Sequence, residues 1–251
     1  MKIQMLGTGS AFAKTYYNTN ALIYANGYNL LIDCGSTAML SLYQLNIPLD
    51  SIDGVWVTHL HADHIGGLEE LAFRTKYELN KKIDLYVMES LMPTLWDHCL
   101  KGTLINDQDG FISLADYYDV IVVKEQQTVK VIEELHIEPI RTEHVPGKPN
   151  YSLFINDFFF YSADLQFNSE LLMQLHRERG CGLIFHDCQL ELPGIVHTTL
   201  EQLLTLPLDI QQNIRLMHYS DNMPQYIGKT GAMQFLTQHE SMDITEKTYK
   251  P

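Results

Sequence analysis

Residues 58–64 read Thr58-His59-Leu60-His61-Ala62-Asp63-His64, directly after an apolar segment that predicts a strand over residues 54–58. Four metal-binding side chains therefore fall within six residues, at His59, His61, Asp63 and His64. Imidazole and carboxylate groups suit zinc, manganese or iron. Because a strand end followed by a tight loop can aim several side chains into one space, the stretch predicts a metal centre.

Short apolar segments alternate with helical segments on both sides of this stretch, which is typical of an α/β architecture. Strands are predicted at 3–6, 21–24, 30–33, 54–58, 83–88, 120–123, 135–141, 151–155, 158–162, 182–186 and 214–217. Helices are predicted at 36–45, 65–79, 90–100, 168–179, 198–206 and 231–238. The pairs Asn26-Gly27 and Asn156-Asp157 predict tight hairpin turns.

The sequence contains no repeat, low-complexity tract or Pro/Gly/Ser-rich linker, so residues 1–251 are expected to form a single domain. Residues 101–118 fit the alternation least well, because a polar run at 106–110 precedes Phe111, Tyr117 and Tyr118. We interpret this segment as a lid or dimer-contact insertion, with a plain surface loop as the alternative.

The chain is acidic, with 17 Lys plus Arg against 31 Asp plus Glu and a formal net charge of −14. Such a surface repels nucleic-acid backbones and anionic membranes, but a small anion can still be drawn to bound metals. No stretch approaches the roughly 18 apolar residues of a membrane span, and the first residues lack a signal-peptide pattern. We therefore expect a cytoplasmic protein with a small-molecule substrate, without membrane or nucleic-acid partners.

The cysteines do not indicate a thiolate metal site. Four are present, and no two form a Cys-x-x-Cys pair: Cys34, Cys99, Cys181 and Cys188. Zinc sites built from thiolates usually contain such pairs. We expect reduced thiols with structural roles, so that any metal is held by histidine and carboxylate.

Residues 58–67 resemble the His-x-His-x-Asp-His signature of the metallo-β-lactamase superfamily. Met5-Leu6-Gly7-Thr8-Gly9-Ser10 resembles the first strand and turn of that superfamily, and Leu31-Ile32-Asp33-Cys34-Gly35 resembles the strand before its first helix. The resemblance covers essentially the whole chain. It implies a four-layered αββα metallo-β-lactamase fold and a hydrolase with two divalent metal ions, zinc or, as the alternative, manganese.

The resemblance also implies the remaining metal ligands, each just after a predicted strand: His144, Asp164 and His218. By the family's pattern, His59, His61 and His144 hold one metal. Asp63, His64 and His218 hold the other, and Asp164 bridges the two. Taken alone, Asp164 could instead cap the helix predicted at 168–179, and His218 could be a buried neutral histidine.

Three further stretches resemble the ribonuclease-Z-like branch of the superfamily. Ile184-Phe185-His186-Asp187-Cys188-Gln189 resembles its His-Glu-Ala-Thr motif, His197-Thr198-Thr199 its His-Ser-Thr, and Met217-His218-Tyr219-Ser220 its His-Phe-Ser. The resemblance implies that His197 donates a proton and that Asp187 holds the imidazole ring of His197. The candidate catalytic residues are therefore His197 and Asp187, together with the candidate ligand Asp63. Asp187 stands where the branch has glutamate, which shortens the reach by one methylene. Thr198 could instead cap the next helix and leave His197 incidental.

Transfer-RNA 3′-processing enzymes of this branch carry a long arm that grips the substrate. Here only residues 145–163 separate His144 from Asp164, and a predicted hairpin occupies most of them. No arm fits in this interval. A tRNA 3′-processing endoribonuclease of the ribonuclease Z type is therefore an alternative function, as is a lactone hydrolase on the same fold.

The whole-chain pattern is most similar to the phage-type anti-Pycsar cyclic-nucleotide phosphodiesterases. That resemblance implies a homodimer that hydrolyses 3′,5′-cyclic nucleotides such as cCMP, cUMP, cAMP and cGMP to nucleoside monophosphates. It also implies evasion of Pycsar anti-phage immunity, in the host cytoplasm for a phage-encoded protein. Aromatic residues that could stack on the base, or that could simply pack in the protein, are Phe12, Tyr16, Tyr17, Phe111, Tyr117 and Tyr118.

Overall fold

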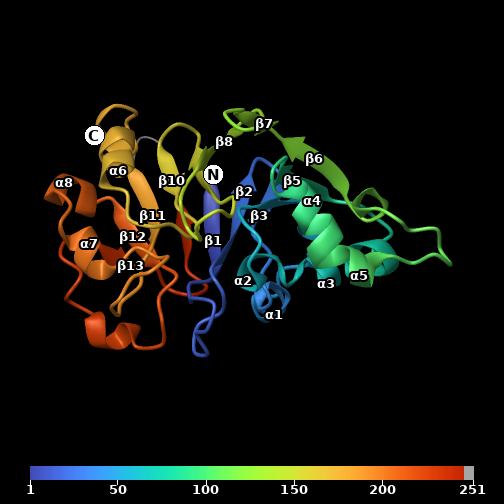
Figure 1. The fold of residues 1–251 in the computed structure, drawn as a ribbon, viewed down its shortest axis with the longest axis horizontal. Coiled ribbons are helices and arrows are strands. Elements are labelled where there is room, and N and C mark those ends of the chain that lie inside the picture. Colours follow the sequence, from blue (N-terminus) through green and yellow to red (C-terminus); the bar gives the residue numbers. More distant parts are fainter. Residues whose placement is uncertain (246–251) are drawn as a thin grey trace.

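The structure is a computed structural model that describes residues 1–245, and two seven-stranded sheets form its centre (Figure 1). The first sheet contains, from edge to edge, β14 (Ser241–Asp243), β1 (Lys2–Gly7), β2 (Asn20–Ala25), β3 (Tyr28–Ile32), β4 (Gly54–Val57), β5 (Asp84–Met88) and β6 (Asp119–Val123). The second contains β13 (Gln234–Phe235), β12 (Ile214–Met217), β11 (Leu183–Asp187), β10 (Phe159–Tyr161), β9 (Tyr151–Ile155), β8 (Leu135–Arg141) and β7 (Val129–Ile132).

The two sheets have the same internal arrangement. In the first, β1, β2 and β3 pair antiparallel, and β3 to β6 pair parallel. In the second, β7 to β10 pair antiparallel, and β10 to β13 pair parallel. Every residue of β4 and of β11 is buried, because both are parallel strands inside a sheet that is covered on both faces.

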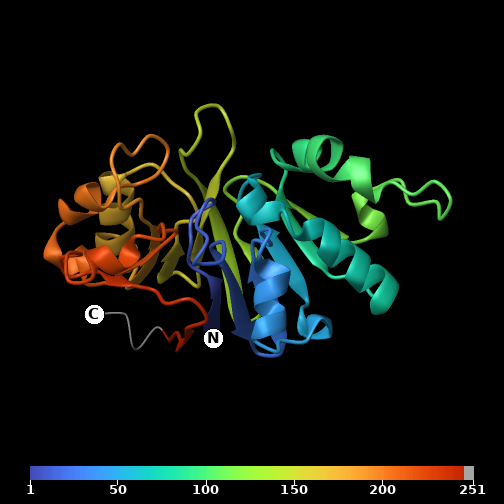
Figure 2. The ribbon, with the colours of Figure 1, turned by 90° about the horizontal axis from the view of Figure 1, so that it is seen from below.

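Helices cover the outer face of each sheet. The first sheet is covered by α1 (Ala38–Gln44), α2 (Ala62–Ile65), α3 (Leu68–Phe73), α4 (Met92–Thr94) and α5 (Lys101–Leu104), with π-helical turns at Arg74–Glu78 and Leu95–Leu100. The second is covered by α6 (Ser169–Arg177), α7 (Leu200–Leu204) and α8 (Leu208–Gln211), as Figures 1 and 2 show. Short 3₁₀ turns lie at Leu49–Ser51, Leu114–Asp116 and Met223–Tyr226. Within the described part of the chain, no helix has the length and apolar character needed to cross a membrane.

The side chains of both sheets interdigitate in one core. Leu22 and Val55 of the first sheet share a buried cluster with Leu153 and Phe185 of the second. Ile184, next to Phe185 in β11, belongs instead to a cluster with α6 and α7, because successive residues of a strand point to opposite faces. The result is four layers in the order αββα, as the sequence predicts.

The predicted helix at 231–238 is wrong. Residues 234–235 form the edge strand β13, which pairs parallel with β12. Met233 and Leu236 are both buried, and their spacing of three imitates a helical stripe. Gly231 has a left-handed φ of 62°, which does not continue a right-handed helix. Strands β7 and β14 and helix α8 are absent from the prediction.

Both predicted hairpins are confirmed. Asn26 and Gly27 join β2 to β3, and Asn156 and Asp157 join β9 to β10. All four residues have positive φ values, at 43°, 85°, 51° and 58°, as two-residue hairpin turns of the primed type require. The second hairpin fills much of the interval 145–163, so no long arm is present there.

Residues 101–118 combine a packed base with an exposed tip. Tyr117 and Tyr118 are fully buried and donate hydrogen bonds to the carbonyl oxygens of Leu104 and Leu68. Asn106 and Phe111 close the tip through two backbone hydrogen bonds. This segment projects farthest from the sheets (Figures 1 and 2). Its role as a lid or dimer contact stays a prediction.

Candidate metal centre

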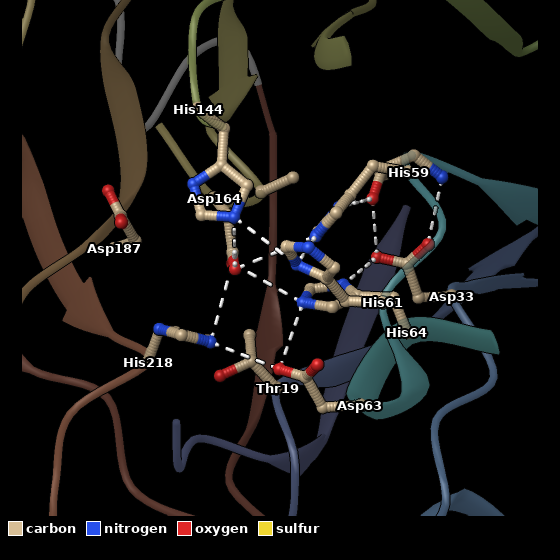
Figure 3. Close-up of polar contacts among 12 residues, drawn as sticks. Thr19, Asp33, His59, His61, Asp63, His64, His144, Asp164, Asp187 and His218 are labelled. Carbon is tan, nitrogen blue, oxygen red and sulfur yellow. Dashed lines mark hydrogen bonds and ion pairs between the residues drawn. The ribbon is translucent and has the colours of Figure 1, made fainter. Parts of the chain in front are cut away.

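The structure gathers all seven predicted ligands where strand ends from both sheets meet (Figure 3). His59 and His61 follow β4, and Asp63 and His64 lie on α2, which begins at the next residue. His144 follows β8, Asp164 follows β10, and His218 follows β12. Because the carboxyl ends of these strands meet at one edge, residues far apart in sequence face one space.

The first group of donor atoms comes from His59, His61 and His144 together with Asp164. His61 Nδ1 lies 3.1 Å from His59 Nε2 and 3.3 Å from His144 Nε2. Asp164 Oδ2 lies 3.7 Å from the Nε2 atoms of both His59 and His144. Three imidazoles and one carboxylate oxygen therefore surround one point.

The second group comes from Asp63, His64 and His218, again with Asp164. Asp63 Oδ2 lies 3.3 Å from His64 Nε2 and 3.3 Å from His218 Nε2. Asp164 Oδ1 lies 3.3 Å and 3.4 Å from the same two nitrogens. Asp164 thus presents one oxygen to each group and lies at the centre of the cluster (Figure 3).

These residues fit divalent metal ions. Ligands placed roughly 2.0–2.2 Å from a tetrahedral ion lie about 3.3–3.6 Å from one another, close to the spacing found here. His64 Nε2 and Asp164 Oδ1 are fully buried and have no hydrogen-bond partner among the described residues. Since buried polar atoms are rarely left unpaired, a bound cation would account for both atoms.

The electrostatics of the two groups also suit cations. Burial lowers the pKa values of His59, His61 and His144, so these imidazoles are neutral and offer their lone pairs. Burial disfavours the charged form of Asp164, but nearby His218 and His64 lower its pKa well below the usual range. An ionised carboxylate beside the neutral imidazoles of the first group is a site for positive charge, and in the second group the neighbouring carboxylates Asp164, Asp33 and Asp63 raise the pKa of His64 despite its burial.

Asp33 is a supporting residue that sequence reasoning missed. Its Oδ2 accepts a hydrogen bond from Nδ1 of His64 at 2.7 Å, and the carboxylate also accepts bonds from the backbone and hydroxyl of Thr58. A carboxylate on the distal nitrogen fixes the tautomer and ring orientation of a metal-binding histidine. The only signal in the sequence is an aspartate that ends an apolar strand.

Three residues at this edge have left-handed backbones although none is glycine. Their φ values are 62° at Asp33, 50° at Ala163 and 59° at His218. Such conformations cost free energy and persist where the surrounding structure imposes them, often at functional sites. The sharp turns after β3, β10 and β12 aim Asp33, Asp164 and His218 into the cluster.

His197 and Asp187 lie beside the donor groups. His197 Nδ1 donates a hydrogen bond to Asp187 Oδ2 at 3.0 Å, and the His197 ring stacks on His218 with centroids 4.7 Å apart. Burial opposes protonation of His197, but the hydrogen bond to Asp187 and neighbouring carboxylates raise its pKa. Asp187 therefore favours the protonated form of a histidine that lies at the edge of the cluster.

The capping alternatives for these residues are wrong. Asn168, not Asp164, caps α6, because its side chain accepts a hydrogen bond from the backbone N–H of Leu171. Thr199, not Thr198, caps α7 through a capping box with Gln202. Asp164 is left without a capping role.

Three cavities open around the site. The reaction cavity, about 520 Å³, is lined by Asp63, Asp164, His197 and Phe12 among others. An outer cavity of about 660 Å³ adjoins it and shares Phe12 and His197. A third, about 390 Å³, lies against His59, His61 and His144 and does not include His197.

The family model described as Anti-Pycsar protein Apyc1 matches residues 1–242. The chain belongs to the Apyc1 family. The Anti-Pycsar protein Apyc1 of Paenibacillus sp. (strain J14) is 55% identical over 241 residues, which cover 96% of this chain and 98% of that protein. The Anti-Pycsar protein Apyc1 of Bacillus phage BSP38 is 42% identical over 249 residues, covering 94% and 96%. The family that the sequence resemblance predicts, the anti-Pycsar proteins, is therefore confirmed.

Solved structures identify the fold. The metallo-β-lactamase fold protein YhfI from Bacillus subtilis superposes with a TM-score of 0.73 at 18% sequence identity, covering 96% of this chain and 98% of YhfI. The predicted four-layered metallo-β-lactamase fold is confirmed for this Apyc1 family member. Together with its two groups of histidine and aspartate donors, this fold indicates the use of divalent metal.

Proposed function

We propose that the protein is a phosphodiesterase with two divalent metal ions that hydrolyses 3′,5′-cyclic nucleotides to nucleoside monophosphates and so counteracts Pycsar immunity. The observation that carries this proposal is a histidine, His197, that is hydrogen-bonded to Asp187 and lies beside two donor groups that share Asp164. The names of the Apyc1 relatives support an anti-Pycsar role.

The first donor group and the second would each hold one ion, with Asp164 between them. We propose zinc as the native metal and manganese as the alternative, because the donors are imidazoles and carboxylates. When bound, two adjacent divalent ions make water more acidic and neutralise charge on phosphoryl oxygens. The chain's own residues supply the remaining chemistry.

His197 is the proposed general acid. Its Nδ1 is bound to Asp187, so its Nε2 is the atom that can donate a proton to the departing ribose oxygen. Opening a cyclic phosphate requires this proton because an alkoxide is a poor leaving group. Asp187 holds the ring and stabilises its charge, and its Oδ2 also faces the backbone N–H of Leu165 at 3.4 Å.

Asp63 is proposed as both a ligand and a catalytic residue. It lines the reaction cavity, and the charges and hydrogen bonds of His64 and His218 overcome its burial and hold its pKa below the usual range. An ionised carboxylate in this position can accept a hydrogen bond from the attacking water and orient it.

A small substrate fits the molecule better than tRNA does. The net charge of −14 repels a polyanion, and the hairpin between His144 and Asp164 leaves no arm to grip one. A lactone hydrolase would have no use for the His197 and Asp187 pair. We further propose a single domain over residues 1–251, a homodimer, and action in the cytoplasm, that of the host for a phage-encoded protein.

A turnover screen tests this function. The metal-loaded protein is assayed at physiological salt with cyclic mononucleotides, bis(p-nitrophenyl) phosphate, a lactone and pre-tRNA. We expect hydrolysis of the cyclic nucleotides and no efficient cleavage of pre-tRNA, with Asp164→Ala as the inactive variant and His98→Ala as a matched control on the exposed surface. Efficient pre-tRNA processing with inert cyclic nucleotides would promote the tRNA 3′-processing alternative.

A further inference from the structure

Two exposed apolar side chains stand at the mouth of the site. Phe12 is 88% exposed and Ile195 is 76% exposed, although both line the outer cavity that reaches His197 and His218. Large apolar side chains that gather around a cavity mark a surface that binds something. A cavity of about 660 Å³ is within the usual size range of small-molecule sites.

The loop that carries Phe12 is fixed in place. The carboxylate of Asp221 accepts hydrogen bonds from the backbone N–H groups of Lys14, at 2.9 Å, and Thr15, at 2.8 Å. The N–H of Ser10 donates to the carbonyl of Tyr219 at 3.0 Å. Because Tyr219 follows His218 directly, this loop is tied to a strand end that carries a candidate ligand.

The loop that carries Ile195 is fixed as well. The side-chain amide of Gln189 donates to the carbonyl oxygens of Glu191 and Pro193, both at 2.7 Å. His144 Nδ1 donates to the carbonyl of Val196 at 2.8 Å. Gly194 has no room for a β-carbon, which would overlap the side chain of Thr199. Ile195 is therefore held between a candidate ligand and a helix cap.

The structure also shows how Phe12 differs from the other aromatic residues that the sequence suggested for stacking on the base. Tyr117 and Tyr118 are buried in the core, and Tyr16 packs edge-on against Tyr219 with centroids 5.0 Å apart. Phe111 packs against Tyr117, far along the chain from these loops. Of the six aromatic residues named as candidates, Phe12 alone lines a cavity that contains His197.

The chemistry of the proposed reaction indicates which part of a substrate would lie in the outer cavity. In phosphoryl transfer the attacking and leaving oxygens are roughly in line. Both ester oxygens of a 3′,5′-cyclic nucleotide belong to one ribose, so the nucleoside must lie on the side of the acid that protonates the leaving oxygen. His197 lines the reaction and outer cavities but not the third cavity.

We propose that Phe12 and Ile195 form a clamp that holds the nucleobase in the outer cavity, an inference that rests on the proposed function. The base stacks on the Phe12 ring, and Ile195 covers its other side. Two of the polar side chains that line this cavity are engaged within the protein: Asp221 binds backbone N–H groups, and Gln189 binds its own loop. Stacking without contacts to the base edges accepts any base, since every base has a π-face.

The test compares substrates with and without a base. Phe12→Ala and Ile195→Ala are assayed on cAMP, cCMP and the methyl riboside 3′,5′-cyclic phosphate, which lacks a base. Phe12→Ala should lower kcat/KM for the nucleotides roughly 5- to 150-fold through KM, the usual worth of one base stacked on an aromatic ring. The abasic ester has no base to stack on the ring, so its kcat/KM should stay close to that of the wild-type protein. Phe12→Tyr should retain activity because it keeps the ring, and Tyr43→Ala is the control for an exposed aromatic outside the cavities.

The outcomes separate the clamp from the function beneath it. If the wild-type protein cleaves neither cyclic nucleotide nor abasic ester, the proposed function is wrong and the clamp falls with it. If the wild-type protein cleaves both, and Phe12→Ala slows both equally or neither, the clamp alone is overturned. An equal loss on both substrates with a change in sedimentation would assign Phe12 to a contact between copies of the chain instead.

Discussion

Removing the imidazole of His197 should separate chemistry from metal binding. His197 lies 3.0 Å from Asp187 and outside the two donor groups that share Asp164. His197→Ala should therefore retain the metal content of the wild-type protein. Turnover of cyclic nucleotides should fall about 10²–10⁴-fold, the usual contribution of a positioned general acid.

Asp187→Asn should act in the same direction with a smaller effect. A hydrogen bond to a charged partner is worth about 1.5–3 kcal/mol, which corresponds to a loss of roughly 10- to 150-fold. The ring of His197 would remain in place, so a proton could still be delivered. Asp187→Asn should also retain the metals, because neither donor group with Asp164 includes Asp187.

The assay measures steady-state kinetics on a cyclic nucleotide and on bis(p-nitrophenyl) phosphate, with metal content determined by elemental analysis. The loss in His197→Ala should shrink on the nitrophenyl ester, whose leaving group of low pKa departs without a proton. The control is His98→Ala, which removes an exposed histidine. Equal losses on both substrates would refute the general-acid role and assign His197 to substrate binding, and loss of metal would make it a ligand or structural residue.

Three further predictions concern the metals and pH. Purified protein should hold close to two metal ions per chain, and Asp164→Ala should lower occupancy of both positions; elemental analysis that finds one ion or none in folded wild-type protein would contradict this. Asp33→Asn should weaken metal affinity about 10- to 100-fold in a chelator competition, with Asp50→Asn as the exposed control, because it removes the negative charge and one of the two acceptor oxygens that His64 and Thr58 share. Because Asp187 raises the pKa of His197, turnover should fall as pH rises through that raised value, and Asp187→Asn should move this fall to lower pH; an unshifted profile would disprove the link.

The candidate ligands could be predicted from the sequence partly because of how strands end and partly from the family resemblance, which implied His144, Asp164 and His218. His59, His61, Asp63 and His64 are close in the chain, so one strand end and one helical turn suffice to bring them together. His144, Asp164 and His218 each follow a strand that the apolar pattern already indicates. The hairpins at Asn26 and Asn156 were predictable for the same reason, since turn chemistry is local.

Edge strands were not predictable in this way. β14 pairs with β1 from the opposite end of the chain, and β13 depends on β12 for its backbone partners. A two- or three-residue strand has too few side chains to show an alternating pattern. Its conformation is decided by the unpaired N–H and C=O groups of the neighbour that it completes.

Only the tertiary structure showed which side chains share a space. Asp33 is hydrogen-bonded to His64, 31 positions along the chain. Phe12 and Ile195, which are far apart in the sequence, line the same cavity. The sequence named six aromatic residues for one role, and of these six only Phe12 lines a cavity together with His197. Residue type and local pattern determine what a side chain can do, but packing of two sheets determines what it faces.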